Sequence, residues 1–230
     1  MTRPMLVIGN KLYSSWSLRG WLGMKAFGLP FEETLIPLYR PESKARLLEH
    51  SPSGKVPLLV DGDIRVWESL AIIEYLAEKH PEAQIWPRDP KARAHARAIC
   101  SEMHAGFMAL RYACPMNLGK RFAAKDRGDA VAADVARLTE IFRSTRERFG
   151  TGGRFLFGAF SAADAMYAPV AARFQTYSIQ VDATSEAYVD AVIGHPAFQE
   201  WRTAALREPW VIVDSETDEP AIEVHRKARG

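Results

Sequence analysis

Hydrophobic and polar positions divide the chain into two parts with different periodicities. In the first 80 residues, short apolar runs alternate with helical stretches. These predict strands near 5–9, 31–36, 56–60 and 64–67, and helices near 15–27, 41–49 and 68–79. The leading strand–helix–strand order implies a parallel strand pair, and Asp61-Gly62 predicts a hairpin between the last two strands. We therefore expect an α/β domain over residues 1–80.

The remainder of the chain has a helical pattern almost throughout. Three prolines mark residues 81–90 as a linker. Ser161-x-x-Asp164 has the spacing of a capping box at the start of a helix. We expect an all-helical domain over residues 91–230, with an extended or mobile tail after Trp210. Its helices are predicted at about 91–113, 131–149, 161–177, 183–193 and 197–206.

Composition excludes several classes of function. The 230 residues carry a formal net charge of +2, with Lys and Arg scattered along the chain, whereas nucleic-acid binding requires a clustered basic face. No apolar run reaches the roughly 18 residues that a membrane helix needs. The two cysteines, Cys100 and Cys114, have no metal-type spacing and provide no disulfide framework. We expect a cytoplasmic chain with no metal, no membrane and no nucleic acid as partner.

The first candidate site is a group of hydroxyls between the first strand and the first helix. Ser14, Ser15 and Ser17 stand where the first helical turn leaves backbone N–H groups unpaired. A serine there serves as an N-cap. The same donors, together with the helix dipole, can also hold a thiolate or another anion. For this stretch alone, capping is the simpler interpretation.

Two further motifs lie in the same domain. Pro57 starts a strand after a loop, which makes Val56-Pro57 a candidate cis peptide and leaves the Val56 backbone free to pair with an extended peptide. Glu68-Ser69 opens a helix, where the serine and free N–H groups suit a carboxylate and the glutamate suits an ammonium. Each motif also has a purely structural interpretation, as a strand-edge proline and as another N-cap.

In this order and spacing, the motifs resemble the glutathione transferase superfamily over residues 5–210. Ser14-Ser15-x-Ser17-x-Arg19 is similar to the S-S-C-x-x-R signature of its zeta class. The resemblance implies the glutathione transferase fold, α/β plus all-α: an N-terminal thioredoxin-like domain that binds glutathione, followed by an all-helical C-terminal domain that binds an electrophile. It also implies a homodimer with glutathione as co-substrate.

The resemblance assigns roles to the residues around the sulfur. Ser14 would donate its hydroxyl to the glutathione thiolate, and Ser15 would assist. The Val56 backbone, held by Pro57, would pair with the cysteinyl unit. If Ser14 is the wrong hydroxyl, Ser15 and Tyr13 are the next candidates.

The two ends of glutathione would be bound by charged and hydroxyl groups. Glu68 and Ser69 would hold the γ-glutamyl end. Lys55 or Arg40 would reach the glycyl carboxylate, although a lone Lys or Arg is by default a solvated surface charge.

The second domain would supply the electrophile pocket, together with Trp16. Its candidate residues are Met103, Phe107, Arg111 and Arg173. Met and Phe at helical spacing are equally ordinary core residues, and His104 beside them is most simply a structural histidine. Arg111 and Arg173 form a hypothetical anion clamp. Arg173 is the nearest candidate for the arginine with which zeta enzymes grip a substrate carboxylate, but it lies about one helical turn closer to the capping box.

The expected reaction is attack of a serine-stabilised thiolate on an electrophilic carbon. Trp16 stands where zeta enzymes have cysteine, and this disfavours disulfide-reductase chemistry. Two alternatives share the N-terminal site: a glutathione-dependent cis–trans isomerase of the maleylacetoacetate type, and a non-catalytic binding module of the same fold. Retention of Ser14, Glu68 and Ser69 argues against the binding module.

Overall fold

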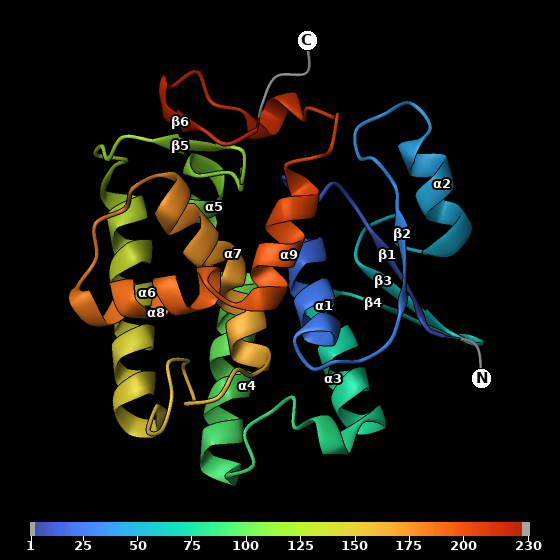
Figure 1. Ribbon diagram of the computed structural model, residues 1–230, viewed down its shortest axis with the longest axis horizontal. Helices are drawn as coiled ribbons and strands as arrows, with labels where there is room; N and C mark the ends of the chain where they lie inside the picture. The colour runs from blue at the N-terminus through green and yellow to red at the C-terminus, as the bar shows by residue number, and fades with distance from the viewer. Residues whose placement is uncertain (1–2, 227–230) are drawn as a thin grey trace.

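The computed structural model describes residues 3–226, so the ends of the two predicted domains, residues 1–2 and 227–230, lie outside the described residues. The first half forms a mixed sheet with strand order β2-β1-β3-β4 and three helices (Figure 1). Its elements are β1 (Met5–Ile8), α1 (Ser15–Lys25), β2 (Glu32–Leu35), α2 (Ser43–His50), β3 (Leu58–Asp61), β4 (Ile64–Trp67) and α3 (Ser69–Lys79). The predicted parallel pair β1–β2 and the β3–β4 hairpin are both confirmed.

The alternation of side chains along the strands gives this sheet two buried faces. Leu6, Ile8 and Leu59 belong to the large hydrophobic core that includes α1 and α3. Val7 and Leu58 point the other way, into a smaller cluster closed by α2. The two faces explain why β1 is apolar at every position, as expected for a strand covered on both sides.

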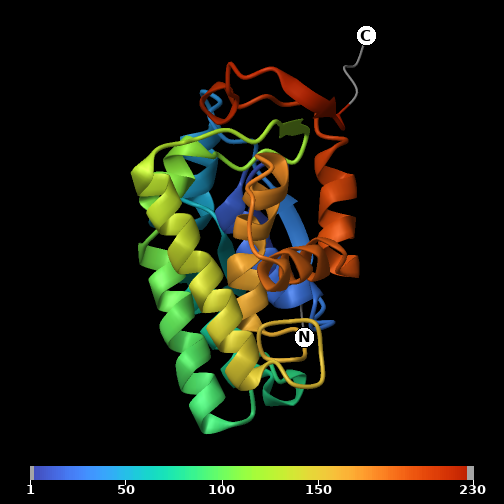
Figure 2. The same ribbon diagram turned by 90° about the vertical axis from the view of Figure 1, so that its left-hand side faces the viewer.

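The second half is helical, as predicted, with one addition. Its elements are η1 (Pro81–Ala83), α4 (Pro90–Ala105), α5 (Met108–Ala113), β5 (Lys120–Phe122), α6 (Asp129–Phe149), α7 (Ala162–Thr176), α8 (Ala183–Ile193), α9 (Pro196–Ala205), η2 (Val213–Ser215) and β6 (Ala221–Val224). Figures 1 and 2 show α4 and α6 side by side, where Arg137 of α6 donates to the Glu102 carboxylate of α4. No helix within residues 3–226 has the length and apolar character required to cross a membrane.

Two sequence-based expectations in this half are corrected. The helix predicted over 91–113 is interrupted, because Phe107 adopts a left-handed φ of 62° between α4 and α5. The tail after Trp210 is not simply extended: β6 pairs antiparallel with β5 and closes one end of the helical domain (Figure 2). These three- and four-residue strands lack a clear sequence signal, because they are stabilised by each other and not by local periodicity.

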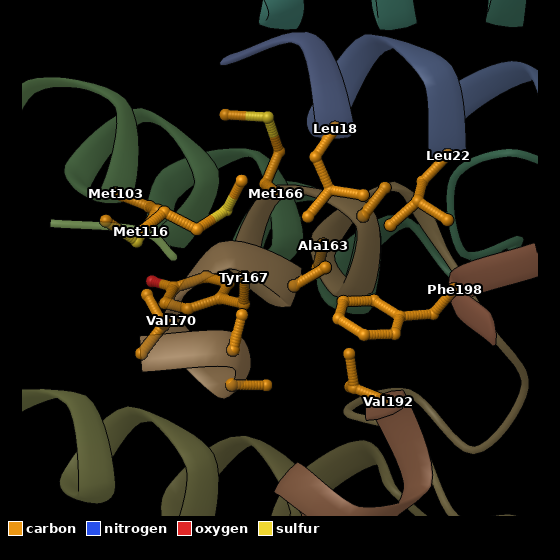
Figure 3. Packing of buried hydrophobic residues seen from close by; sticks show 14 of the residues in the cluster. Leu18, Leu22, Met103, Met116, Ala163, Met166, Tyr167, Val170, Val192 and Phe198 are labelled. Atoms are coloured by element: carbon orange, nitrogen blue, oxygen red, sulfur yellow. The ribbon is translucent and has the colours of Figure 1, made fainter. Parts of the chain in front are cut away.

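The two halves share one core, centred on α7. This helix is buried on nearly all sides, which explains its lack of a polar face. Figure 3 shows Leu18 and Leu22 of α1 packed toward Met166 and Ala163 of α7. The predicted capping box at its start is confirmed: the buried Asp164 carboxylate accepts from the Ser161 N–H and hydroxyl and from the Leu156 N–H.

Candidate functional site

The serine cluster caps α1, as its position predicts. Ser14 is the N-cap, with a backbone φ of −80°, and its Oγ accepts from the Ser17 N–H at 3.3 Å. The Ser14 hydroxyl donates to Ser17 Oγ at 2.8 Å, and Ser17 Oγ also accepts from the Gly9 N–H. The Ser15 hydroxyl makes no hydrogen bond within the described part of the chain. The capping role of Ser14 is therefore shown, while Ser15 carries the uncommitted hydroxyl.

A glycine contact brings the second motif to the start of α1. The Val56-Pro57 peptide is cis, as the sequence predicts. A Cβ on Gly20 would lie 3.0 Å from the Pro57 ring, so the absence of a side chain lets α1 pack directly on this turn. The β3–β4 pairing begins at Leu58, which leaves Val56 outside the ladder. Val56 lines the same cavity as Trp16 of the first turn of α1, and its backbone there suits pairing with an extended ligand.

Glu68 is held in an unfavourable backbone conformation. Its φ is 69° and its ψ is 126°, a region that a residue with a Cβ rarely adopts, and its side chain does not cap α3. Such a conformation costs of order 1–3 kcal/mol and is found mainly at functional sites. The conformation directs the Glu68 carboxylate to the domain junction, where its Oε2 lies 3.5 Å from His104 Nε2 of α4.

These elements enclose a cleft of about 210 Å³ between the domains. The residues that line it are Trp16, Ser53, Lys55, Val56, Pro57, Glu68 and His104, and Ser14 and Ser15 are not among them. A carboxylate at one point, an ammonium at another and a free backbone edge between them suit an extended zwitterionic peptide. The cleft lies at the point where α1 begins.

Positive charge is concentrated behind this cleft. Two guanidinium groups lie over the Trp16 ring, Arg19 at 4.6 Å and Arg111 at 4.9 Å from its centroid. Arg19 is fully buried, and its pKa is lowered by burial and then by repulsion from Arg111 and Arg173. Within residues 3–226 none of these three arginines forms an ion pair with a carboxylate. Together with the N-terminus of α1, they favour an anion in the cleft.

Comparison with known proteins identifies both halves. The N-terminal domain of glutathione S-transferases matches residues 13–79, and the C-terminal domain of glutathione S-transferases matches residues 128–204. The chain belongs to the glutathione S-transferase family.

Individual relatives agree with this assignment. A probable maleylacetoacetate isomerase of Caenorhabditis elegans is 40% identical over 109 residues, which are 47% of this chain and 50% of that protein. Maleylacetoacetate isomerase of Rattus norvegicus is 26% identical over 78% of this chain and 82% of its own length. The match to the Caenorhabditis elegans protein therefore spans only about half of the length of that relative.

The fold is shared with solved glutathione transferases. The crystal structure of a glutathione transferase homolog from Burkholderia gl BGR1, with bound glutathione, superposes with a TM-score of 0.67. That alignment covers 89% of this chain and 98% of the other at 23% identity. At this identity the likeness shows the glutathione S-transferase fold.

The cleft of this glutathione S-transferase contains only some of the residues that the sequence suggested for glutathione. Lys55, Val56, Pro57 and Glu68 line it. Ser69 does not, because it is fully buried and its hydroxyl is directed to Met166 Sδ at 3.9 Å. Arg40 is exposed at the start of the α2 segment and is not among the residues that line the cleft.

The expected electrophile pocket does not form as the sequence suggested. Trp16 lines the cleft, but Met103 and Phe107 are buried in the core, where Figure 3 shows Met103 near Met116 and Tyr167. Arg173 is buried and donates to the carbonyls of Cys114 and Pro169.

Arg111 donates to the carbonyls of Met103 and Gly106 and thereby bridges the break between α4 and α5. The proposed clamp arginines are thus held by backbone carbonyls. Helical spacing alone does not show which face of α4 meets the other domain.

The Tyr13 hydroxyl is committed to a carboxylate outside the cleft. It donates to the Glu216 carboxylate at 2.6 Å, and burial together with this hydrogen bond raises the pKa of Tyr13 above its usual range. Tyr13 instead lines a second cavity of about 580 Å³, between the β1–α1 turn and the C-terminal tail. Tyr13 and Trp16 thus face different cavities, with Ser14 and Ser15 between them in the chain. Among the apolar residues of this cavity are Leu12, Leu206, Pro209 and Val211.

His104 and Ser53 are the two cleft residues that were not predicted as ligands. Ser53 lies in a polar loop without a distinguishing motif. His104 lies on α4 and reaches the cleft only because α4 packs across the domain junction. No local sequence signal separates it from a structural histidine.

Proposed function

We propose that this protein is a glutathione transferase that conjugates the glutathione thiolate to an electrophilic small molecule. The observation that carries the proposal is the cleft that joins the Glu68 carboxylate, the Lys55 ammonium and the free Val56 backbone. Glutathione presents matching groups: an ammonium at its γ-glutamyl end, a peptide unit at its cysteine, and a terminal carboxylate. Each charged end then makes a charge-assisted interaction, which is stronger than a neutral hydrogen bond.

Activation of the thiol requires selective stabilisation of its anion. A cysteine thiol with a pKa of about 8.5 is only about 3% ionised at pH 7. Lowering this pKa by about two units needs roughly 2.7 kcal/mol. A hydroxyl donor at the α1 N-terminus and the helix dipole supply this order of energy, and the guanidinium groups of Arg19 and Arg111 add positive potential. We assign Ser14 as the donor, assisted by Ser15. The Ser14 hydroxyl donates to the thiolate once it has rotated away from Ser17 Oγ.

The electrophile in this proposal occupies the 580 Å³ cavity. Its support is the apolar wall formed by Leu206, Pro209 and Val211, together with its position on the other side of the Tyr13–Trp16 turn. A thiolate at Ser14 or Ser15 then lies between the two cavities.

The alternative function is a glutathione-dependent cis–trans isomerase, which the names of the two curated relatives favour. In that reaction the thiolate adds to a double bond and leaves after rotation. The geometry of Arg173 favours the transferase, since this arginine is committed to the Cys114 and Pro169 carbonyls and does not face the cleft. Product analysis separates the two functions, because conjugation consumes the thiol and isomerisation regenerates it.

A homodimer and a cytoplasmic location complete the proposal. Ile64 and Trp67 of β4 are large apolar side chains with 48% and 43% exposure, next to α3, and a second copy would cover them. Sedimentation velocity at micromolar concentration distinguishes the dimer from a monomer. Cys100 and Cys114 are both free and buried, as suits a reducing compartment.

The deciding experiment is a titration of the bound thiol. Ultraviolet absorbance of the thiolate is followed against pH for wild type, Ser14→Ala and Ser15→Ala, each saturated with glutathione. We expect Ser14→Ala to raise the bound-thiol pKa by at least one unit, while Ser15→Ala has a smaller effect. The reverse order assigns the role to Ser15, and an unchanged pKa in both variants refutes activation by serine. A wild type that binds no glutathione refutes the function itself.

A further inference from the structure

His104 lines the wall of the cleft, and its side chain makes no hydrogen bond within residues 3–226. It extends from α4 of the helical domain toward α3 of the other domain. Its Nδ1 is buried with no hydrogen-bond partner among residues 3–226, and its Nε2 has only the 3.5 Å contact with Glu68. Other histidines are used by the fold: His95 bonds Thr145 Oγ1, and His195 caps α9. The acceptor lone pair of His104 is therefore not used by the fold.

The surroundings keep His104 uncharged at neutral pH. Its pKa is lowered chiefly by burial. The attraction of Glu68 opposes this lowering, and repulsion from Arg19 and Arg111 adds to it. The Trp16 ring packs on it with a centroid distance of 5.1 Å. The titratable side chains that line the cleft with it, within the described residues, are Lys55 and Glu68. A neutral imidazole thus lines the cleft. Its Nδ1 is buried, so Nε2, on the side of Glu68, is the nitrogen that a ligand in the cleft can reach.

A proton acceptor is needed there because serine cannot fill that role. The Ser14 oxygen accepts from the Ser17 N–H, and its hydroxyl is a donor, suited to stabilise a thiolate once formed. Lys55 is already a cation, and Glu68 is assigned to the ammonium of glutathione. Among the groups of the cleft, His104 is the one with a vacant nitrogen and a neutral resting state.

Building on the proposed function, we propose that His104 is the general base that ionises glutathione. The S–H bond breaks, its electron pair stays on sulfur, and the proton forms an N–H bond with the unprotonated imidazole nitrogen. Glu68, whose two oxygens can accept from several donors, then stabilises the imidazolium while it holds the glutathione ammonium. After the C–S bond forms, the imidazolium releases its proton to the departing group or to water, and His104 is neutral again.

The test measures the rate of thiolate formation after rapid mixing with glutathione in weak buffer. The variant is His104→Gln, and the matched control is His95→Gln, since His95 lies on the same helix with a pKa likewise lowered by burial. We expect His104→Gln to slow thiolate formation by about 10²-fold or more, with little change in glutathione affinity. We also expect added imidazole to restore the rate of His104→Ala. In wild type the rate decreases as the pH falls through the lowered pKa of His104, and this dependence is absent from His104→Gln.

Three outcomes overturn the proposal and are distinguishable. Equal rates of thiolate formation in His104→Gln, His95→Gln and wild type overturn the role of His104 and leave the transferase function standing. A wild type that forms no bound thiolate overturns the function and the base together. In the third outcome, His104→Gln forms thiolate slowly but added imidazole does not restore the rate of His104→Ala. This result indicates a positioning role for His104 and also overturns general-base catalysis.

Discussion

Replacement of Glu68 by glycine should stabilise the protein while it weakens glutathione binding. The backbone of Glu68 has a φ of 69°, at a cost of order 1–3 kcal/mol. Glycine relieves this strain, but it also increases the conformational entropy of the unfolded chain, which lowers the free energy of unfolding by about 0.4–1 kcal/mol. The variant also loses the contact between Glu68 and His104. Because these side chains are 49% and 29% exposed, that contact contributes little to the free energy of unfolding. The net expectation is a gain of about 1 kcal/mol in the free energy of unfolding.

The matched variant is Glu68→Ala, which removes the carboxylate but keeps a Cβ in the strained conformation. Its free energy of unfolding should stay near that of wild type. Both variants lose the charge-assisted hydrogen bond to the glutathione ammonium, worth roughly 1.5–3 kcal/mol. At about 1.4 kcal/mol per factor of ten, the Kd for glutathione should rise about 10- to 100-fold in each.

Urea unfolding monitored by tryptophan fluorescence measures the first effect, and isothermal titration calorimetry with glutathione measures the second. Protomer concentration is held constant, because an oligomer makes apparent stability concentration-dependent. The reasoning about strain is refuted if Glu68→Gly is no more stable than Glu68→Ala at equal m-values. Wild-type glutathione affinity in both variants would show that Glu68 does not bind the ammonium.

Two further predictions test the electrophile cavity and the core. Val211→Trp should raise the KM for the electrophile about fivefold or more, because the larger side chain fills part of the cavity at a cost of order 1–3 kcal/mol, and leave the KM for glutathione unchanged. Val213→Trp is the control, since Val213 is 79% exposed and does not line the cavity, so equal effects of the two would contradict the placement. Burial raises the pKa of Asp164 from 3.8 to about 6, so the folded state binds more protons than the unfolded state between these values. This contribution to stability is present below pH 3.8 and is lost as pH rises through 6, by roughly 2–3 kcal/mol at ~1.4 kcal/mol per pKa unit. In urea unfolding, Asp164→Asn should lack this dependence, and a parallel pH profile for both proteins would show that Asp164 is not desolvated.

The sequence alone specified most elements of the fold. Short apolar runs bounded by turn residues located β1 to β4, and the period-3.6 pattern located most helices, because each of these elements buries side chains that lie close together in the sequence. Local chemistry located the Ser14 cap, the cis Val56-Pro57 peptide and the Ser161–Asp164 box, since each depends on residues close in sequence. The β5–β6 ribbon was missed because its strands lie about 100 residues apart and pair only in the folded chain.

The candidate site depends both on local sequence motifs and on tertiary packing. Local motifs supplied Lys55, Val56 and Glu68, because strand ends and helix starts expose backbone groups and side chains whatever the rest of the chain does. Only tertiary packing decided that His104 faces the cleft and that Met103 and Arg173 do not. All three lie on helices whose rotation is set by the packing of α4 and α7 across the domain junction. A helical pattern shows which residues share a face, but the neighbouring helix decides which face meets the ligand.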